Sequence, residues 1–178
     1  MSYDAPPPSA VPPPPPPPAP GAGQPAELLD RFVARLIDGV LIAVVAVPIV
    51  MIFAVATVFS SGSGWLTSII SSVLYAALGL GYFGFMESSR GQTVGKMVMK
   101  LRTQGPGGEL PTMEQALKRN AWMALSLIGI LPFLGGFLSS IAYLAAVITI
   151  ALGINNNTAT RQAWHDNFAG GTQVIKVG

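Results

Sequence analysis

The chain has 178 residues, which is enough for one domain or two small ones. Only 10% of its residues are charged and 51% are hydrophobic, which excludes an ordinary soluble globular domain because so few charges cannot cover a surface. The absence of cysteine excludes a disulfide scaffold, and a single histidine argues against a tetrahedral zinc site. We therefore expect a membrane protein with a polar tail, with no metal, no cofactor and no nucleic-acid partner.

Proline dominates the N-terminal segment. Residues 1–25 hold 12 of the 16 prolines, including the unbroken run Pro12–Pro18. Proline has no N–H and a fixed φ angle, so this run favours a polyproline II rod of roughly 22 Å. We expect residues 1–25 to be a disordered cytoplasmic tail and residues 26–178 to form the membrane domain. Two interpretations of the tail remain open: a docking segment for the aromatic groove of a partner protein, or a tail without a dedicated partner.

Two membrane helices are predicted from a long uncharged stretch. Residues 39–86 contain no charged side chain, and two passes of about 20 residues each fit within them. The first pass is predicted over residues 32–59, where Pro48 kinks the helix without ending it. Residues 60–64 are serine and glycine only, which predicts a turn, and the second pass follows over residues 65–86.

The basic residues of the next segment, 87–119, predict the orientation of the protein in the membrane. Residues 87–119 hold six of the ten basic residues, and residues 60–64 hold none. The positive-inside rule therefore places residues 87–119 in the cytoplasm. The N-terminus is then cytoplasmic as well, and we expect a multi-pass protein of the plasma membrane.

A second uncharged stretch, residues 120–160, leaves two topologies open. Thr112 and Gln115 form a capping-box pattern, so a helix is predicted to begin near Met113 and to enter the membrane around Ala121. The sequence Leu-Pro-Phe-Leu-Gly-Gly at residues 131–136 then interrupts the apolar stretch. It connects either two short helices of a hairpin, or an interfacial piece and a single pass that leaves the C-terminus outside.

Two short polar segments favour the hairpin. Residues 172–177 alternate with period two, as a strand does, and residues 98–103 in the cytoplasmic loop have a similar composition. Pairing of the two would satisfy both backbones and place both on one side of the membrane. The predicted fold class is all-α and polytopic. It has about four membrane helices, two clear ones and a hairpin interrupted by proline and glycine, with short cytoplasmic strands and a disordered proline-rich tail.

Three charged residues stand at the start of the first apolar helix. Arg31, Arg35 and Asp38 fall on roughly one helical face. A carboxylate in a membrane helix costs up to about 2.5–3.5 kcal/mol at the centre and less near the interface. Two readings are equally consistent with this stripe: a site for an ion, proton or substrate, or an interfacial ion pair that anchors the helix.

Two further motifs invite a chemical reading. His165 and Asp166 are adjacent, but no suitable nucleophile accompanies them, so a structural pair near the membrane surface is favoured over catalysis. The segment Gly91–Lys96 has some of the spacing of a phosphate-binding loop but lacks its first glycine and its hydroxyl residue. We predict instead a short amphipathic surface helix in which Lys96 and Lys100 extend their ammonium groups to the interface.

Taken in order, these motifs resemble the RDD family of bacterial membrane proteins. The first helix reads R-x-x-A-x-x-x-D at residues 31–38, and G-x-T-x-G-K follows at residues 91–96. A basic Leu101–Arg102 pair, an Arg119–Asn120 pair and a D-x-x-A-G-G-T-x-V ending at residues 166–174 complete the pattern, with one extra glycine in the last motif. The proline-rich head is similar to that of the proline-rich antigens of actinobacteria.

The resemblance implies a membrane domain for which transport is often suggested. By matching the motifs, it implies a signature trio that forms an ion or substrate site, Arg31, Asp38 and Asp166, with companions at Arg35, Lys96 and His165.

Two functional hypotheses follow, neither of which involves an enzyme. In the first, the chain is a small transporter or channel component, a homo-oligomer in which Asp38 binds a cation or proton. In the second, it is a non-catalytic anchor whose proline-rich tail recruits a protein, and Arg31 or Arg35 pairs with Asp166 to close the structure.

Overall fold

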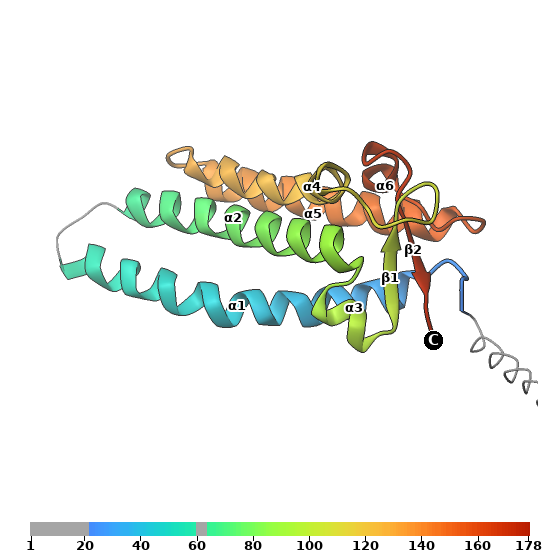
Figure 1. Cartoon of the computed structure of the whole chain (residues 1–178). Coiled ribbons are helices and arrows are strands. Elements are labelled where there is room, and N and C mark those ends of the chain that lie inside the picture. Colours follow the sequence, from blue (N-terminus) through green and yellow to red (C-terminus); the bar gives the residue numbers. More distant parts are fainter. Residues whose placement is uncertain (1–21, 60–63) are drawn as a thin grey trace, which may run out of the picture.

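The computed structural model describes residues 22–59 and 64–178. Helices account for most of these residues, and they lie side by side in one elongated bundle that carries a small two-stranded ribbon at one end (Figure 1). The long helices are α1 (Leu28–Phe59), α2 (Gly64–Arg90) and α5 (Gly135–Asn156); the shorter elements are α3 (Val94–Val98), β1 (Leu101–Gln104), α4 (Met113–Asn120), the 3-10 helix η1 (Ala121–Ile130), α6 (Trp164–Phe168) and β2 (Gln173–Lys176).

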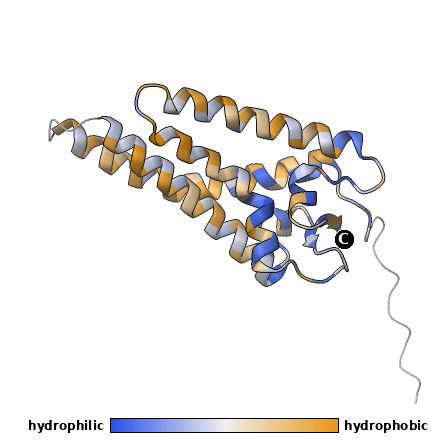
Figure 2. Ribbon diagram, turned by 90° about the horizontal axis from the view of Figure 1, so that it is seen from above, coloured by the Kyte–Doolittle hydropathy of each residue, from blue (hydrophilic) through white to orange (hydrophobic). Residues whose placement is uncertain are grey.

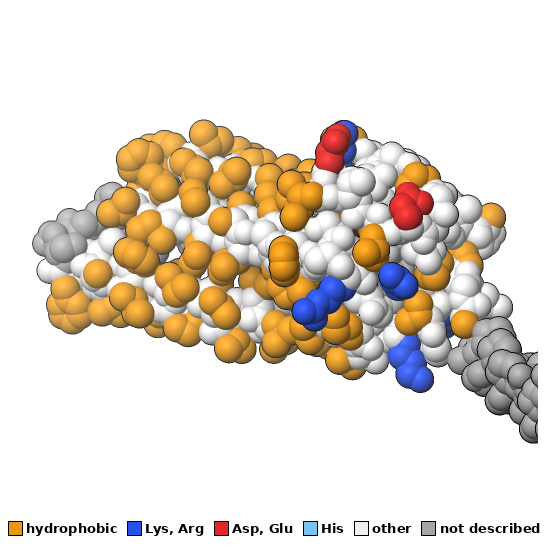
Figure 3. Space-filling view, viewed as in Figure 1, with side chains coloured by type: hydrophobic (Ala, Val, Ile, Leu, Met, Phe, Trp, Pro, Cys, Tyr) orange, Lys and Arg blue, Asp and Glu red, His pale blue; other side chains and the backbone are white. Residues whose placement is uncertain are grey.

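The described residues contain three helices, α1, α2 and α5, that are long and apolar enough to cross a membrane. Apolar side chains cover most of the bundle, whereas charged side chains gather at the end that carries the ribbon (Figures 2 and 3). The uncharged part of α1, residues 39–59, is roughly 31 Å long at 1.5 Å per residue, which matches a hydrocarbon core of about 30 Å. The outward-facing apolar surface is therefore the part of the molecule that contacts lipid.

The two predicted passes are confirmed. Helix α1 continues through Pro48 to Phe59, and α2 begins at Gly64; residues 60–63 of the predicted turn lie outside the described residues. Helix α2 extends to Arg90, one turn beyond the apolar run, and this extra turn carries Glu87 into the charged end of the bundle.

The second uncharged stretch, residues 120–160, forms a hairpin. Thr112 caps α4 through the predicted capping box with Gln115, and the chain enters the apolar bundle as η1. This first arm is a 3-10 helix of ten residues, roughly 20 Å long, whereas the second arm, α5, has 22 residues. The indole N–H of Trp65 on α2 donates to the carbonyl of Ile130 at the hairpin tip, at 2.6 Å.

The predicted strand pairing is also present. Strands β1 and β2 are antiparallel, with Leu101 opposite Lys176 and Gln104 opposite Gln173. The ribbon lies beside the start of α1, so the C-terminus returns to the end of the bundle from which α1 departs (Figure 1). This arrangement corresponds to the hairpin topology and not to the single pass.

Residues just before α1 also join the ribbon. The amide of Gly23 donates to the carbonyl of Lys176, and the amide of Ala26 donates to that of Val174, both at 2.8 Å. Pro25 forms a bridge with Ile175. Residues 22–25 therefore belong with the membrane domain, while the remainder of the predicted proline-rich tail, residues 1–21, lies outside the described residues.

Candidate functional site

A group of charged side chains is buried where the long helices meet the ribbon. All three of its carboxylate residues, Asp38, Glu87 and Asp166, are at most 1% exposed. We call the following seven residues the charge cluster: Arg31, Arg35, Asp38, Glu87, Lys96, Arg119 and Asp166. Asp38 and Glu87 each stand where an uncharged membrane helix reaches its polar end, so the cluster lies at the boundary of the membrane.

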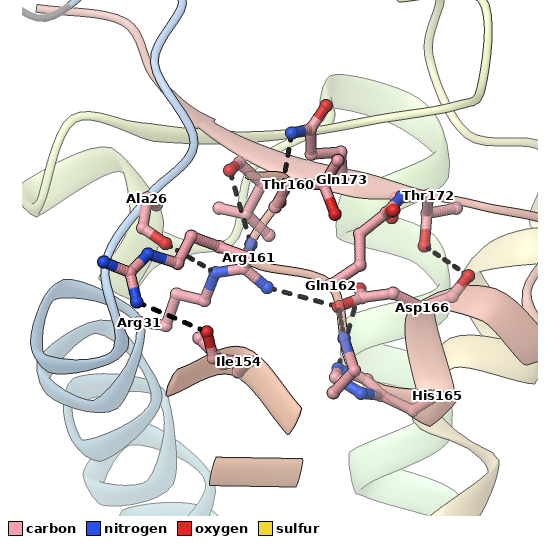
Figure 4. Close-up of polar contacts among 12 residues, drawn as sticks. Ala26, Arg31, Ile154, Thr160, Arg161, Gln162, His165, Asp166, Thr172 and Gln173 are labelled. Carbon is pink, nitrogen blue, oxygen red and sulfur yellow. Dashed lines mark hydrogen bonds and ion pairs between the residues drawn. The ribbon is translucent and has the colours of Figure 1, made fainter. Parts of the chain in front are cut away.

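Asp166 joins three separate segments of the chain. Its carboxylate lies 3.3 Å from Nη1 of Arg31 on α1 (Figure 4) and 2.9 Å from Nε of Arg119 on α4. The backbone N–H of Ala163 donates to the same carboxylate at 3.1 Å. Burial acts to raise the pKa of Asp166, but the neighbouring positive charges, Arg119 foremost, outweigh burial and hold this pKa below its usual value. The carboxylate is therefore ionised and fixes both arginines.

Glu87 is the second carboxylate that joins elements. Lys96 forms an ion pair with it, Nη1 of Arg119 lies 3.6 Å away, and the amide of Asn120 donates to it at 3.2 Å. The hydroxyl of Thr103 on β1 accepts hydrogen bonds from both Lys96 and Arg119, at 2.7 and 2.8 Å. Helix α2, the loop helix α3, the ribbon and α4 are thus tied together by one network.

The prediction that Lys96 reaches the membrane surface is wrong. Its side chain is 9% exposed and lies against Glu87, because α3 packs against α1 and β1 and Lys96 extends from it to the end of α2. Burial lowers the pKa of the Lys96 ammonium to about 8, although the negative charge of Glu87 opposes that shift. Lys100, by contrast, is exposed.

Asp38 is held by neutral donors. It accepts hydrogen bonds from the hydroxyls of Tyr82 and Thr93, at 2.7 and 2.6 Å, and from the backbone N–H of Gly95 at 2.8 Å. No cationic group of the described residues lies within 4.0 Å of it, so the ion pair considered for the Arg31, Arg35 and Asp38 stripe is not formed. Thr93 also caps α3.

Gly95 explains why α3 can approach α1 so closely. A Cβ atom at this position would lie 2.0 Å from the carbonyl oxygen of Ala34 and 3.0 Å from the carboxyl carbon of Asp38. Only glycine therefore lets the backbone N–H reach Asp38. The G-x-T-x-G-K motif thus holds α3 against α1: Thr93 and Gly95 donate hydrogen bonds to Asp38. Lys96, the last residue of the motif, is buried against Glu87.

Arg35 differs from the other cluster arginines. Its guanidinium stacks 3.6 Å above the ring centroid of Phe83 and lies 5.0 Å from that of Trp122. It donates to Asn120 Oδ1 through Nη1 and Nη2, at 3.2 and 3.1 Å. Within the described part of the chain, no carboxylate oxygen lies within 4.0 Å of Arg35.

His165 lies next to Asp166 in space as well as in sequence, but the pair is not a good hydrogen bond: Nε2 is 3.6 Å from the carboxylate. Burial lowers the pKa of His165 to about 3, so its ring is neutral at physiological pH. Its Nδ1 atom is buried and has no hydrogen-bond partner among the described residues. Those residues also contain no group of three or more His, Cys, Asp or Glu side chains placed to hold a metal ion.

The structure brings most of the predicted site residues together. Arg31 and Asp166 are in contact, as the anchor hypothesis predicted, whereas Asp38 is bound separately by α2 and α3. Sequence reasoning did not identify Glu87, although it is the first charge after 48 uncharged positions. Arg119 and Asn120 appeared only as a family motif, yet they contact two carboxylates of the cluster.

The fold and the charge cluster together define a multi-pass helical membrane protein whose polar ends are fastened by buried ion pairs. The model of the RDD family matches residues 25–170, so the chain belongs to this family. Neither a curated protein nor a solved structure matched the chain.

Proposed function

We propose that this RDD family protein is a subunit of a small transporter or channel for an ion or small solute, and that it works as a homo-oligomer. The observation that carries the proposal is a row of three cavities with shared lining residues. The charged cavity, of about 150 Å³, is lined by charge-cluster residues and by Val147. Val147 also lines the tyrosine cavity, of about 430 Å³, and this shares Tyr75, Ser126 and Ser139 with the serine cavity, of about 460 Å³.

The lining of the row is mainly apolar and carries hydroxyl groups that can contact a polar solute. Hydroxyl groups recur along its membrane part, from Ser68 and Ser72 on α2 to Ser139 and Tyr143 on α5. Tyr75 and Tyr143, which both line the tyrosine cavity, share a hydrogen bond with 3.0 Å between their hydroxyl oxygens. Four helical arms enclose little volume, so a second copy would complete a pathway along the open sides of these cavities.

Flux through proteoliposomes tests the proposal. We would measure radiolabelled sodium, chloride and glycerol as probes, with wild type and with Ser139→Leu, which places a bulky side chain in both shared cavities. The matched control is Ser89→Leu, at an exposed position at the charged end of α2. We expect at least one probe to cross faster than in protein-free liposomes and Ser139→Leu to reduce that flux. Protein-free rates for all three probes would refute the proposal.

The role of Asp38 needs a separate test, because a cation there must displace one of its three donors. If Asp38 is the ion site, Asp38→Asn abolishes flux and the protein stays folded. If Asp38 only holds α3 against α1, the same change lowers the unfolding midpoint in detergent.

A second candidate function, a non-catalytic anchor or adaptor, is favoured by the ion pair between Arg31 and Asp166, which closes the domain without a ligand. Under this proposal the proline-rich tail recruits a protein. Removal of residues 1–21 leaves the contacts of residues 22–26 with β2 intact, and it should remove a partner that photo-crosslinking identifies in the full chain. An unchanged set of crosslinked proteins would exclude recruitment by the tail.

We further propose a plasma-membrane location with the charged end of the bundle in the cytoplasm, on the basis of the basic residues of the 87–119 segment. The chain has no cysteine, so single cysteines at Ser63, Gln104 and Thr160 can be labelled with an impermeant maleimide in intact cells. Labelling of Ser63 alone is expected. Labelling of Gln104 or Thr160 would contradict the proposed topology.

A further inference from the structure

The charged cavity combines two kinds of lining. Its walls are apolar and come from α1 and α5, with Leu28 and Phe32 on one side and Val147, Ile150 and Ile154 on the other. Its floor is made of charge-cluster side chains, Asn120 and His165. Val147 on the membrane helix α5 is 39% exposed, so the α5 wall continues into the surface that contacts lipid.

The floor carries excess positive charge. Four of its lining residues are cationic, Arg31, Arg35, Lys96 and Arg119, and two are anionic, Asp38 and Glu87. Asp166 lies behind the lining and reduces the excess of the whole cluster to one positive charge. The internal carboxylates are therefore too few for the cations that surround the cavity.

Arg35 holds the excess charge. A guanidinium has five N–H donors, and Arg35 uses two of them, both toward Asn120. The stacking on Phe83 and Trp122 fixes the plane of the group, so its remaining donors, which have no partner among the described residues, keep one direction. His165 Nδ1, on the same cavity, is a buried polar atom without a hydrogen-bond partner in the described part of the chain.

The depth of Arg35 identifies the kind of anion. It stands one turn before Asp38, at the level where the uncharged membrane part of α1 begins. The phosphates of membrane lipids lie at this level, and basic pockets between membrane helices bind anionic headgroups. We infer that the charged cavity binds an anionic phospholipid, with its phosphate on Arg35 and its acyl chains along the apolar wall of α5, at Ile150 and Val147. This inference does not depend on transport.

Lipid binding can be measured without any flux. The full chain would be reconstituted in nanodiscs of phosphatidylglycerol or of phosphatidylcholine, and lipids retained after release would be counted by native mass spectrometry. We expect one phosphatidylglycerol to be retained preferentially, and Arg35→Gln to weaken that binding by about tenfold or more, since hydrogen bonds to charged groups are among the stronger ones. The control Lys118→Gln removes an exposed cation outside the cavity and should change nothing.

A second variant covers the case in which Arg35→Gln fails to fold. Ile150→Trp fills the apolar wall and leaves every charge in place, and we expect it to exclude the lipid as well. Equal retention of the two lipids, or unchanged phosphatidylglycerol retention in both variants, would overturn the inference. Competition by millimolar inorganic phosphate would also overturn it, because the occupant would then be a soluble anion. Retention of lipid in a protein that shows no flux would support the lipid site and count only against transport.

Discussion

Replacement of Asp166 by asparagine should be among the most damaging single changes in this chain. The side chain is fully buried, and Asp166→Asn keeps its shape while removing its charge. Arg31 and Arg119 would then face each other across a neutral amide, at the positions where they now lie 3.3 and 2.9 Å from a carboxylate. Loss of one partner from a buried ion pair typically lowers the free energy of unfolding by about 3–5 kcal/mol.

The magnitude can be tested against a surface pair in the same protein. Unfolding in detergent would be followed by tryptophan fluorescence while SDS is added, for wild type, Asp166→Asn and Glu114→Gln. Glu114 forms an exposed ion pair with Lys118 one helical turn away, so its replacement should leave the unfolding curve unchanged.

A double-mutant cycle separates the ion pair from general packing. The cycle combines Asp166→Asn with Arg119→Gln, and we expect a coupling free energy of about 0.5–3 kcal/mol. If Asp166→Asn costs less than about 1 kcal/mol, or if the two changes are additive, then the ion pairs do not hold the ribbon and α6 to α1 and α4 as described.

Three further predictions concern the same end of the bundle. His165 has a folded pKa of about 3 against 6.5 in the unfolded chain, so below pH 6.5 only the unfolded chain binds a proton. Stability should then fall by about 1.4 kcal/mol per pH unit as pH decreases from 6.5 toward 5, and His165→Gln should flatten that slope in pH-dependent unfolding curves. Gly95→Ala should lower stability by about 1–3 kcal/mol or more, because its methyl group meets Ala34, and wild-type stability would contradict the close approach. Thr112→Ala removes the cap of α4 and should cost about 1 kcal/mol in the same assay, whereas no loss would contradict the capping box.

Much of the fold could be predicted because membrane helices depend on the length of uncharged runs. Residues 39–59 and 64–86 have no charge, and the bilayer allows few other structures for such segments. The capping-box pattern of Thr112 and Gln115 also predicted where α4 begins. The pairing of β1 with β2 followed from the need of a lone strand for a partner. The 3-10 form of η1 could not be predicted, because its sequence does not differ in composition from an α-helical arm.

The site could be predicted only in part, because its partners are set by how distant segments turn toward each other. Lys96 in a short basic loop was interpreted as a surface residue, and its pairing with Glu87 depends on α3 packing against α1. Arg35 and Asp38 lie on one face of α1, yet Gly95 and two hydroxyls take the carboxylate, so the expected pair does not form. Sequence spacing identifies residues that can meet, but it does not identify which of several donors binds a given carboxylate.

The competition for Asp38 has a consequence for the whole cluster. Because neutral donors satisfy this carboxylate, its charge does not pair with Arg35, and Arg35 remains beside aromatic rings with donors to spare. Had the i, i+3 pair formed, the cavity floor would hold no uncommitted cation and α3 would lose its attachment to α1. The motif at residues 91–96 therefore fastens the loop to the first helix and at the same time leaves one arginine available at the membrane boundary, where lipid headgroups lie.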